Sequence, residues 1–74
     1  MGQVLDVRGL SCPLPLMRTR KAMQSLPAGE ALEVQATDPG AARDIPALCE
    51  SNGYRLEKAE EKDGVFLFTI RQSG

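Results

Sequence analysis

Hydrophobic and polar residues alternate along several short stretches of the chain, most regularly over residues 32–37. A period of two is typical of a strand that buries one of its faces. Residues 3–7 and 65–71 show the same alternation. The positions expected to face inward are Leu5, Val7, Leu32, Val34, Ala36, Phe66, Phe68 and Ile70. The pattern therefore predicts three half-buried strands.

A further strand is predicted to begin at Tyr54 and Leu56 and to pair with the last strand through a tight turn. Asp63-Gly64 is a strong signal for such a hairpin turn. Residues 58–62 are polar and charged, which is how an exposed strand edge avoids pairing with other chains. Leu67 falls on the opposite face from the core and is expected to be partly exposed.

The period changes to that of a helix from Pro15 to about Leu26. The expected inner face consists of Leu16, Thr19, Ala22, Met23 and Leu26, and the outer face includes Arg18, Lys21 and Ser25. Residues 27–30, Pro-Ala-Gly-Glu, break the pattern. An amphipathic, basic first helix is predicted.

Two helix-start signals follow the second strand. Asp38 can cap a helix and is followed by a proline, and the segment Asp44-Ile45-Pro46 repeats that signature. Because a proline deep inside a helix is costly, we expect a short turn at residues 39–43 and the helix proper at residues 45–52, closed by Gly53. Its buried face would carry Ile45, Leu48 and Cys49.

The predicted order is β-α-β-α-β-β, with no internal repeat or low-complexity segment. It fits an α/β (α+β) two-layer sandwich with both helices on one face of a four-stranded mixed sheet. A chain of 74 residues has room for one small core. We therefore expect a single domain over residues 1–74.

Composition excludes several function classes. The chain has no histidine and two cysteines, so zinc sites and Cys-His nucleophile pairs within it are excluded. One tyrosine, two phenylalanines and a net charge of −1 argue against direct nucleic-acid binding. No apolar run approaches the roughly 20 residues that span a bilayer. Two cysteines and an N-terminus without a secretory pattern favour a reducing cytoplasm.

Cys12 is the candidate chemical group, because it is presented between the first strand and the first helix. It begins the tetrapeptide Cys12-Pro13-Leu14-Pro15. Proline is tolerated in the first turn of a helix and poorly inside one, so Pro13 and Pro15 mark the helix start, with Leu14 either the cap or a first-turn residue. The thiol would lie near the positive end of the helix, where a thiolate is favoured. The alternative is an ordinary buried cysteine.

Charge around Cys12 is expected to be positive. Residues 1–29 hold four basic groups against Asp6, while residues 30–74 hold five basic and nine acidic groups. The four basic groups are Arg8, Arg18, Arg20 and Lys21. They would assist the helix terminus, although the two prolines remove amide donors, so we expect a modestly lowered thiol pKa. The patch is either a solvated face or a surface that steers Cys12 to an acidic partner.

Cys49 lies in an apolar helical stripe and is interpreted as a buried packing residue. The alternative is that it resolves an oxidised Cys12.

The chain resembles the small sulfur-carrier proteins of the TusA (SirA-like) family over essentially its full length. The shared residues are Leu5-Asp6-x-x-Gly9-Leu10-x-Cys12-Pro13-x-Pro15, Asp38-Pro39 and Arg43-Asp44-Ile45-Pro46-x-x-Cys49. The resemblance implies strand order 1-2-4-3, an antiparallel fourth strand and no cofactor. It implies that Cys12 accepts a sulfane sulfur from a cysteine desulfurase or another donor and passes it, as a persulfide, to an acceptor protein.

Outlets in that family include thiolation of transfer-RNA uridine, molybdenum-cofactor supply and the handling of oxidised sulfur. Arg18, Arg20 and Lys21 follow the thiol closely, so we expect them to contact the donor or acceptor protein. Two rival interpretations stay open. One is a non-catalytic regulatory or transporter-associated module in which the prolines merely shape a docking loop. The other is a thiol-disulfide protein, which the absence of a Cys-x-x-Cys pair disfavours.

Overall fold

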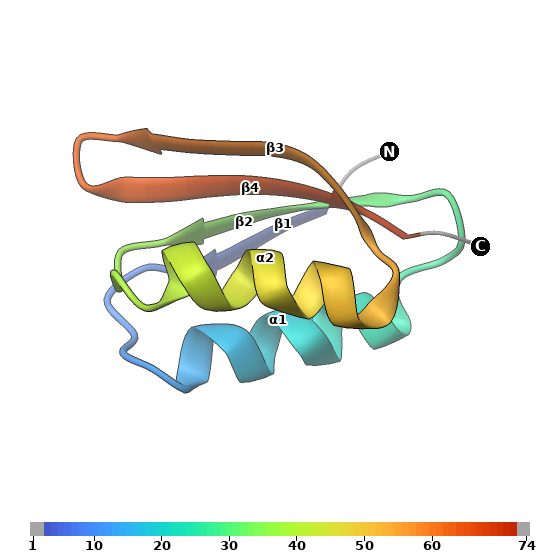
Figure 1. The fold of residues 1–74 in the computed structure, drawn as a ribbon, viewed down its shortest axis with the longest axis horizontal. Helices are drawn as coiled ribbons and strands as arrows, with labels where there is room; N and C mark the ends of the chain where they lie inside the picture. The colour runs from blue at the N-terminus through green and yellow to red at the C-terminus, as the bar shows by residue number, and fades with distance from the viewer. Residues whose placement is uncertain (1–2, 73–74) are drawn as a thin grey trace.

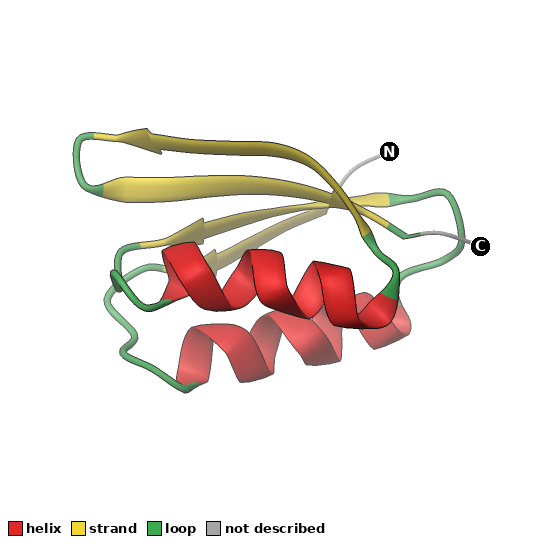
Figure 2. Ribbon diagram, in the orientation of Figure 1, coloured by secondary structure: helices red, strands yellow, loops and turns green. Residues whose placement is uncertain are grey.

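A computed structural model describes residues 3–72, so the ends of the domain expected at residues 1–74 lie outside the described residues. The elements follow the predicted order (Figure 1): β1 Gln3–Val7, α1 Leu14–Ser25, β2 Ala31–Ala36, α2 Ala41–Asn52, β3 Arg55–Lys62 and β4 Val65–Arg71. Both helices cover the same face of the sheet (Figure 2), which confirms the two-layer sandwich. Neither helix in residues 3–72 is long and apolar enough to cross a membrane.

The sheet has the strand order β1-β2-β4-β3. β1 and β2 are parallel, and β4 is antiparallel to both β2 and β3. This confirms the order and the antiparallel fourth strand that the family resemblance implies. The parallel pair needs a crossover connection, and α1 supplies it. As a result, the carboxyl ends of β1 and β2 lie side by side at one end of the sheet.

The core lies between the sheet and the helices, where the alternating residues of β1, β2 and β4 meet. Val34 on β2 is paired with Leu5 on β1 and with Phe68 on β4. The residues less than a tenth exposed include Val7, Leu32, Val34, Ala36, Phe68 and Ile70, with Leu5 and Phe66 packed against them. The inward positions expected from the alternation are confirmed, and Leu67 is half-buried on the other face.

The first helix begins at Leu14, one residue earlier than the periodicity suggested. Pro13 occupies the capping position and Leu14 is therefore a first-turn residue. Thr19, Met23 and Leu26 are buried, as expected from the helical face. The buried Thr19 hydroxyl donates to the carbonyl of Pro15 at 2.8 Å, which satisfies the polar group without a tertiary partner.

The second helix corrects the sequence-based prediction. The expected short turn at residues 39–43 and separate helix at 45–52 form one helix, Ala41–Asn52, with Pro46 inside it. Asp38 does not cap it through its side chain, because Gly40 is the capping residue and no side-chain capping bond forms. Ala41, Ile45 and Cys49 are buried at a spacing of four. Burying this stripe offsets the one backbone hydrogen bond that Pro46 cannot donate.

The β3–β4 hairpin turns through Asp63 and Gly64, whose φ angles of 52° and 81° match the predicted two-residue turn. β3 begins at Arg55 and continues through the charged residues 58–62, which form an edge of the sheet. The pairing of β3 with β4 shifts between Leu56 and Lys58. Glu57, the residue at that irregularity, accepts a hydrogen bond from Arg71 Nε at 2.9 Å.

Candidate functional site

The candidate site lies at the edge of the sheet where the parallel strands β1 and β2 end. The β1–α1 and β2–α2 connections run side by side there (Figure 1). In α/β proteins, such carboxyl ends of parallel strands are where functional groups from separate segments meet. Cys12 comes from the first connection, and Asp38 and Gly40 come from the second.

Cys12 is exposed at the entrance to α1. The peptide bond between Cys12 and Pro13 is cis. The Leu14 amide donates to the carbonyl of Ser11, and the Met17 amide donates to the carbonyl of Pro13, each at 3.0 Å. Pro15 is buried in the first turn of the helix. The loop is thus fixed by backbone hydrogen bonds on both sides of Cys12, while the residue itself is exposed.

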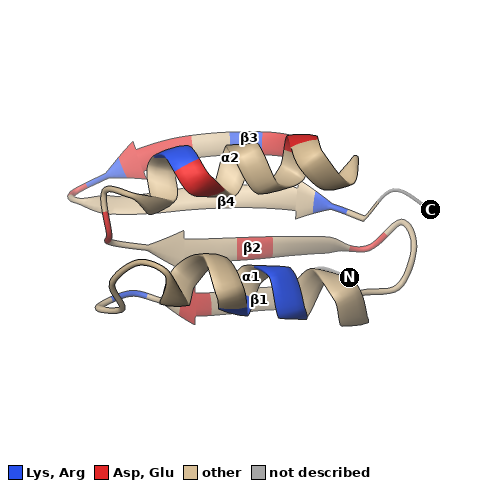
Figure 3. Cartoon of the chain, turned by 60° about the horizontal axis from the view of Figure 1, so that its bottom comes forward, with Lys and Arg blue, Asp and Glu red and all other residues tan. Residues whose placement is uncertain are grey.

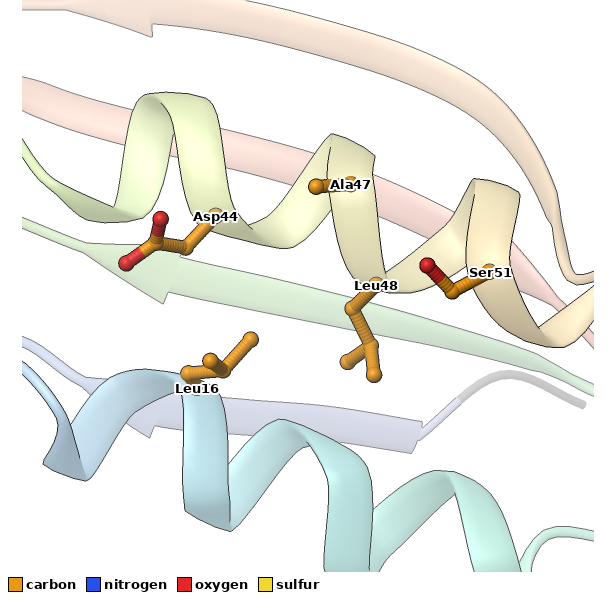
Figure 4. A pocket seen from close by; sticks show the side chains of 5 residues that line it. All are labelled: Leu16, Asp44, Ala47, Leu48 and Ser51. Carbon is orange, nitrogen blue, oxygen red and sulfur yellow. The ribbon is translucent and has the colours of Figure 1, made fainter.

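Among residues 3–72, the thiol has one side-chain hydrogen-bond partner, which is the carboxylate of Asp44. Cys12 Sγ donates to Asp44 Oδ2 at a distance of 3.5 Å. Asp44 lies in the first turn of α2, and its carboxylate projects from that helix on the side of α1 (Figure 4). This contact joins two segments that lie 32 residues apart in the sequence.

A second carboxylate lies close to the same loop. A Cβ atom added to Gly40 would be 2.9 Å from Asp38 Oδ2 and 3.7 Å from Cys12 Cβ. The missing side chain at Gly40 therefore leaves room for the Asp38 carboxylate, whereas the separation from Cys12 Cβ is an ordinary van der Waals contact. Asp38 Oδ2 is buried and has no hydrogen-bond partner among residues 3–72. Negative charge from both Asp38 and Asp44 thus acts on Cys12.

The electrostatic surroundings of Cys12 are the reverse of what the sequence suggested. The hydrogen bond to Asp44 raises the pKa of the Cys12 thiol above its ordinary value, with further contributions from lost hydration and from the charges of Asp44 and Asp38. Arg43 opposes them only in part. The expected modest lowering of the thiol pKa is therefore wrong, because the Asp44 carboxylate accepts the hydrogen bond of the thiol and Asp38 adds a second negative charge.

The basic residues take other positions. Arg8 donates to both oxygens of Asp6 at 2.9 Å and so pairs with that carboxylate. Arg18, Arg20 and Lys21 are exposed on α1, which forms a basic stretch in Figure 3. None of the three forms an ion pair within the described part of the chain. They form an exposed basic surface on the helix that begins beside Cys12.

Two apolar features accompany the thiol. Leu14 and Met17, on the first turns of α1, are 41% and 57% exposed. A shallow groove between α1 and α2 is lined by Leu16, Asp44, Ala47, Leu48 and Ser51. Figure 4 shows Leu16 and Leu48 pointing toward each other from the two helices. Asp44 belongs to both the groove and the thiol contact, so the groove opens beside Cys12.

Cys49 has the predicted buried position and is 2% exposed on the core side of α2. Burial raises the pKa of its thiol. Within residues 3–72, no three side chains of histidine, cysteine, aspartate or glutamate gather as a metal site would require. The chemistry available at this edge of the sheet is therefore that of a single exposed thiol next to two carboxylates.

The fold and the site together define a class of protein, which is a small β-α-β-α-β-β sandwich with one exposed cysteine at a strand-to-helix junction. The family model described as sulfurtransferase TusA matches residues 3–72. The chain belongs to the TusA sulfurtransferase family.

Named relatives agree with that assignment. The sulfur carrier protein TusA of Allochromatium vinosum is 41% identical over 71 residues, covering 96% of this chain and 93% of that protein. The sulfur carrier protein TusA of Pseudomonas putida (strain GB-1) is 45% identical over 69 residues, covering 93% of this chain and 86% of that protein. The crystal structure of the SirA-like protein from Desulfitobacterium hafniense matches with a TM-score of 0.85 at 30% identity, covering 100% of both chains.

Sequence reasoning identified Cys12 but missed its two acidic neighbours. The sequence indicates Asp38 and Asp44 as helix-start residues and as part of the shared motifs, but not as neighbours of Cys12. The fold topology points to them, because the residues that follow two neighbouring parallel strands lie together at the carboxyl ends of those strands. Combined with that rule, the positions of Asp38 and Cys12 after β2 and β1 predict their proximity.

Proposed function

We propose that this chain is a sulfur carrier that holds a sulfane sulfur on Cys12 as a persulfide. The observation that carries the proposal is the exposed thiol at the β1–α1 junction of a chain belonging to the TusA family. Thiolates are the nucleophiles of sulfur exchange, so the sulfur has to be reachable by a second protein. Cys12 meets that requirement and the buried Cys49 does not.

The proposed reaction conserves sulfur, protons and electrons. Cys12, as the thiolate, attacks the outer sulfur of a donor persulfide, and the sulfur–sulfur bond of the donor breaks. The electron pair leaves on the donor cysteine, which takes up the proton that Cys12 loses. An acceptor thiolate then attacks the outer sulfur on Cys12, which leaves as the thiolate. The chain acts as a sulfurtransferase only together with its two partners.

The proposed donor is a cysteine desulfurase or another persulfide-bearing protein, and the acceptor is a downstream sulfur-carrying protein. Uridine thiolation in transfer RNA, molybdenum-cofactor supply and sulfur oxidation are the proposed outlets. The transfers would take place in the cytoplasm, where thiols are kept reduced. Docking is proposed to involve Arg18, Arg20 and Lys21, which are exposed on the helix that begins at the thiol.

Mass spectrometry of the intact protein tests the carrier function. Incubation with a cysteine desulfurase and free cysteine is expected to add one sulfur atom, and fragmentation is expected to locate it on Cys12. Cys12→Ser should carry none, whereas Cys49→Ala should still be loaded. A chain that stays unloaded with several sulfur donors would contradict the proposal. Full biological function of Cys12→Ser would instead favour the non-catalytic docking module.

A further inference from the structure

We propose that Asp44 sets how tightly Cys12 holds its sulfur, because its carboxylate favours the unloaded thiol over the persulfide. This inference rests on the proposed carrier function and concerns the same cysteine. Asp44 contacts the reacting sulfur directly, so its effect does not depend on an intermediary residue. The argument starts from the 3.5 Å contact between Cys12 Sγ and Asp44 Oδ2.

The contact exists only while Sγ carries a hydrogen. In the unloaded protein Sγ is a thiol and donates to the carboxylate. In the persulfide the same atom is bonded to Cβ and to the outer sulfur, so it has no hydrogen to donate. Its lone pairs then face the Asp44 carboxylate. Loading therefore exchanges a favourable contact for an unfavourable one at the same position.

The other charged groups around the thiol strengthen this bias. Asp38, in the loop before α2, adds a second negative charge, and its buried Oδ2 has no compensating hydrogen-bond donor among residues 3–72. Arg43 is the cation that opposes the two carboxylates, and it does so incompletely. A persulfide ionises more readily than a thiol, so the loaded form also places its own negative charge next to Asp38 and Asp44.

Release of the sulfur restores the contact. The acceptor thiolate attacks the outer sulfur, the sulfur–sulfur bond breaks and its electron pair stays on Cys12 Sγ. Sγ then takes up a proton from water. A carboxylate is a much weaker base than a thiolate, so the proton stays on sulfur and is donated to Asp44 as a hydrogen bond. The unloaded carrier is stabilised at the end of the cycle, which favours the release step and opposes the loading step by the same free energy.

An equilibrium measurement tests the proposal. The wild-type protein and Asp44→Asn are each equilibrated anaerobically with a fixed ratio of glutathione persulfide to glutathione. Intact-mass spectrometry gives the ratio of loaded to unloaded carrier. Because the thiol is a weak donor to a charged acceptor, Asp44→Asn is expected to raise this ratio about three- to tenfold. Glu50→Gln removes the same charge from the exposed surface of α2 and should leave the ratio unchanged.

A second measurement separates this role from a structural one. The rate at which iodoacetamide alkylates Cys12 is followed against pH in the same variants. Asp44→Asn is expected to move the midpoint to lower pH, and Glu50→Gln is expected to leave it in place. Asp44→Ser, which also removes the charge and suits a first helical turn, serves if Asp44→Asn does not fold.

The outcomes distinguish the inference from the function on which it rests. Equal loading ratios in the wild-type protein and in folded Asp44→Asn would overturn the role of Asp44 and leave the carrier function intact. A wild-type protein that glutathione persulfide and protein donors all fail to load would overturn both.

Discussion

At the scale of single residues, two opposing effects act on Cys12. A helix N-terminus contributes about 0.3–1 kcal/mol in favour of an anion, which is less than one pKa unit. Pro13 and Pro15 weaken that contribution because they offer no amide hydrogens. The Asp44 carboxylate acts at contact distance and in the other direction. The carboxylates therefore prevail and raise the pKa of the thiol.

The direction of the pKa shift gives a prediction for the wild-type protein. A thiol with a raised pKa is deprotonated only at higher pH, so the alkylation midpoint is expected above about 8.5, the ordinary value for a free cysteine. At pH 7 the thiolate should amount to less than about 3% of the protein. Iodoacetamide rates between about pH 6 and 11 provide the measurement. A peptide with the sequence of residues 11–15 is the reference, and a midpoint below that of the peptide would contradict the expectation.

The surroundings of Cys12 could be predicted only where the neighbouring residues are also close to it in the sequence. Cys12 stands next to the two prolines, so its place at a helix entrance can be inferred from neighbouring residues alone. Asp44 lies 32 residues further on, and its contact with the thiol depends on the parallel pairing of β1 and β2. The local pattern of hydrophobic and polar residues does not indicate which strands pair. The charges of α1 were therefore assigned to the thiol in place of those of α2.

At the scale of elements, residues with special backbone requirements were the most predictable. Asp63-Gly64 marked the hairpin turn and Gly53 marked the end of α2, and both adopt the positive φ angles that such positions need. The start of α2 was not predictable in the same way. Pro46 suggested a break, but the buried stripe of Ala41, Ile45 and Cys49 keeps the helix continuous through it. Tertiary burial outweighed a local preference.

Gly53→Ala tests the helix end. Gly53 has a φ of 71°, and apart from its chain neighbours no atom of the described residues lies within 4 Å of an added Cβ, so the substitution changes backbone conformational energy without a clash. A loss of roughly 1 kcal/mol in the free energy of unfolding is expected, measured by urea denaturation. Ser51→Ala, at an exposed helical position nearby, should cost little. Persulfide loading should be unchanged, because Gly53 is at the opposite end of α2 from Asp44.

At the scale of the whole molecule, the strand order came from the family resemblance and the layer arrangement came from the pattern. Alternation and helical periodicity specify which faces are buried, and four strands with two helices then allow few packings. They do not specify which strands are neighbours. The same scale reveals a division of charge, since α1 is basic while β3 carries both signs (Figure 3). At the site the two carboxylates act on the thiol, whereas the cations lie along α1.

Lys21→Glu tests whether the basic surface of α1 serves docking. Rim charges mainly affect association rates and their salt dependence. Lys21→Glu is expected to slow sulfur transfer from the donor about two- to tenfold at low salt, and the difference should shrink as salt increases. Lys62→Glu makes the same charge change on the exposed β3 edge and is the matched control. Equal slowing by both variants would indicate a general charge effect and would contradict docking through α1.

The burial of Cys49 has a consequence for the amount of sulfur that the protein delivers. The chain has two cysteines, and only Cys12 is accessible to another protein. The proposed persulfide on Cys12 would give each molecule one sulfur atom, with no second accessible thiol to store another. Sulfur flux through it would therefore scale with the number of carrier copies and with their turnover, so the abundance of the protein would itself set the capacity of the route it serves.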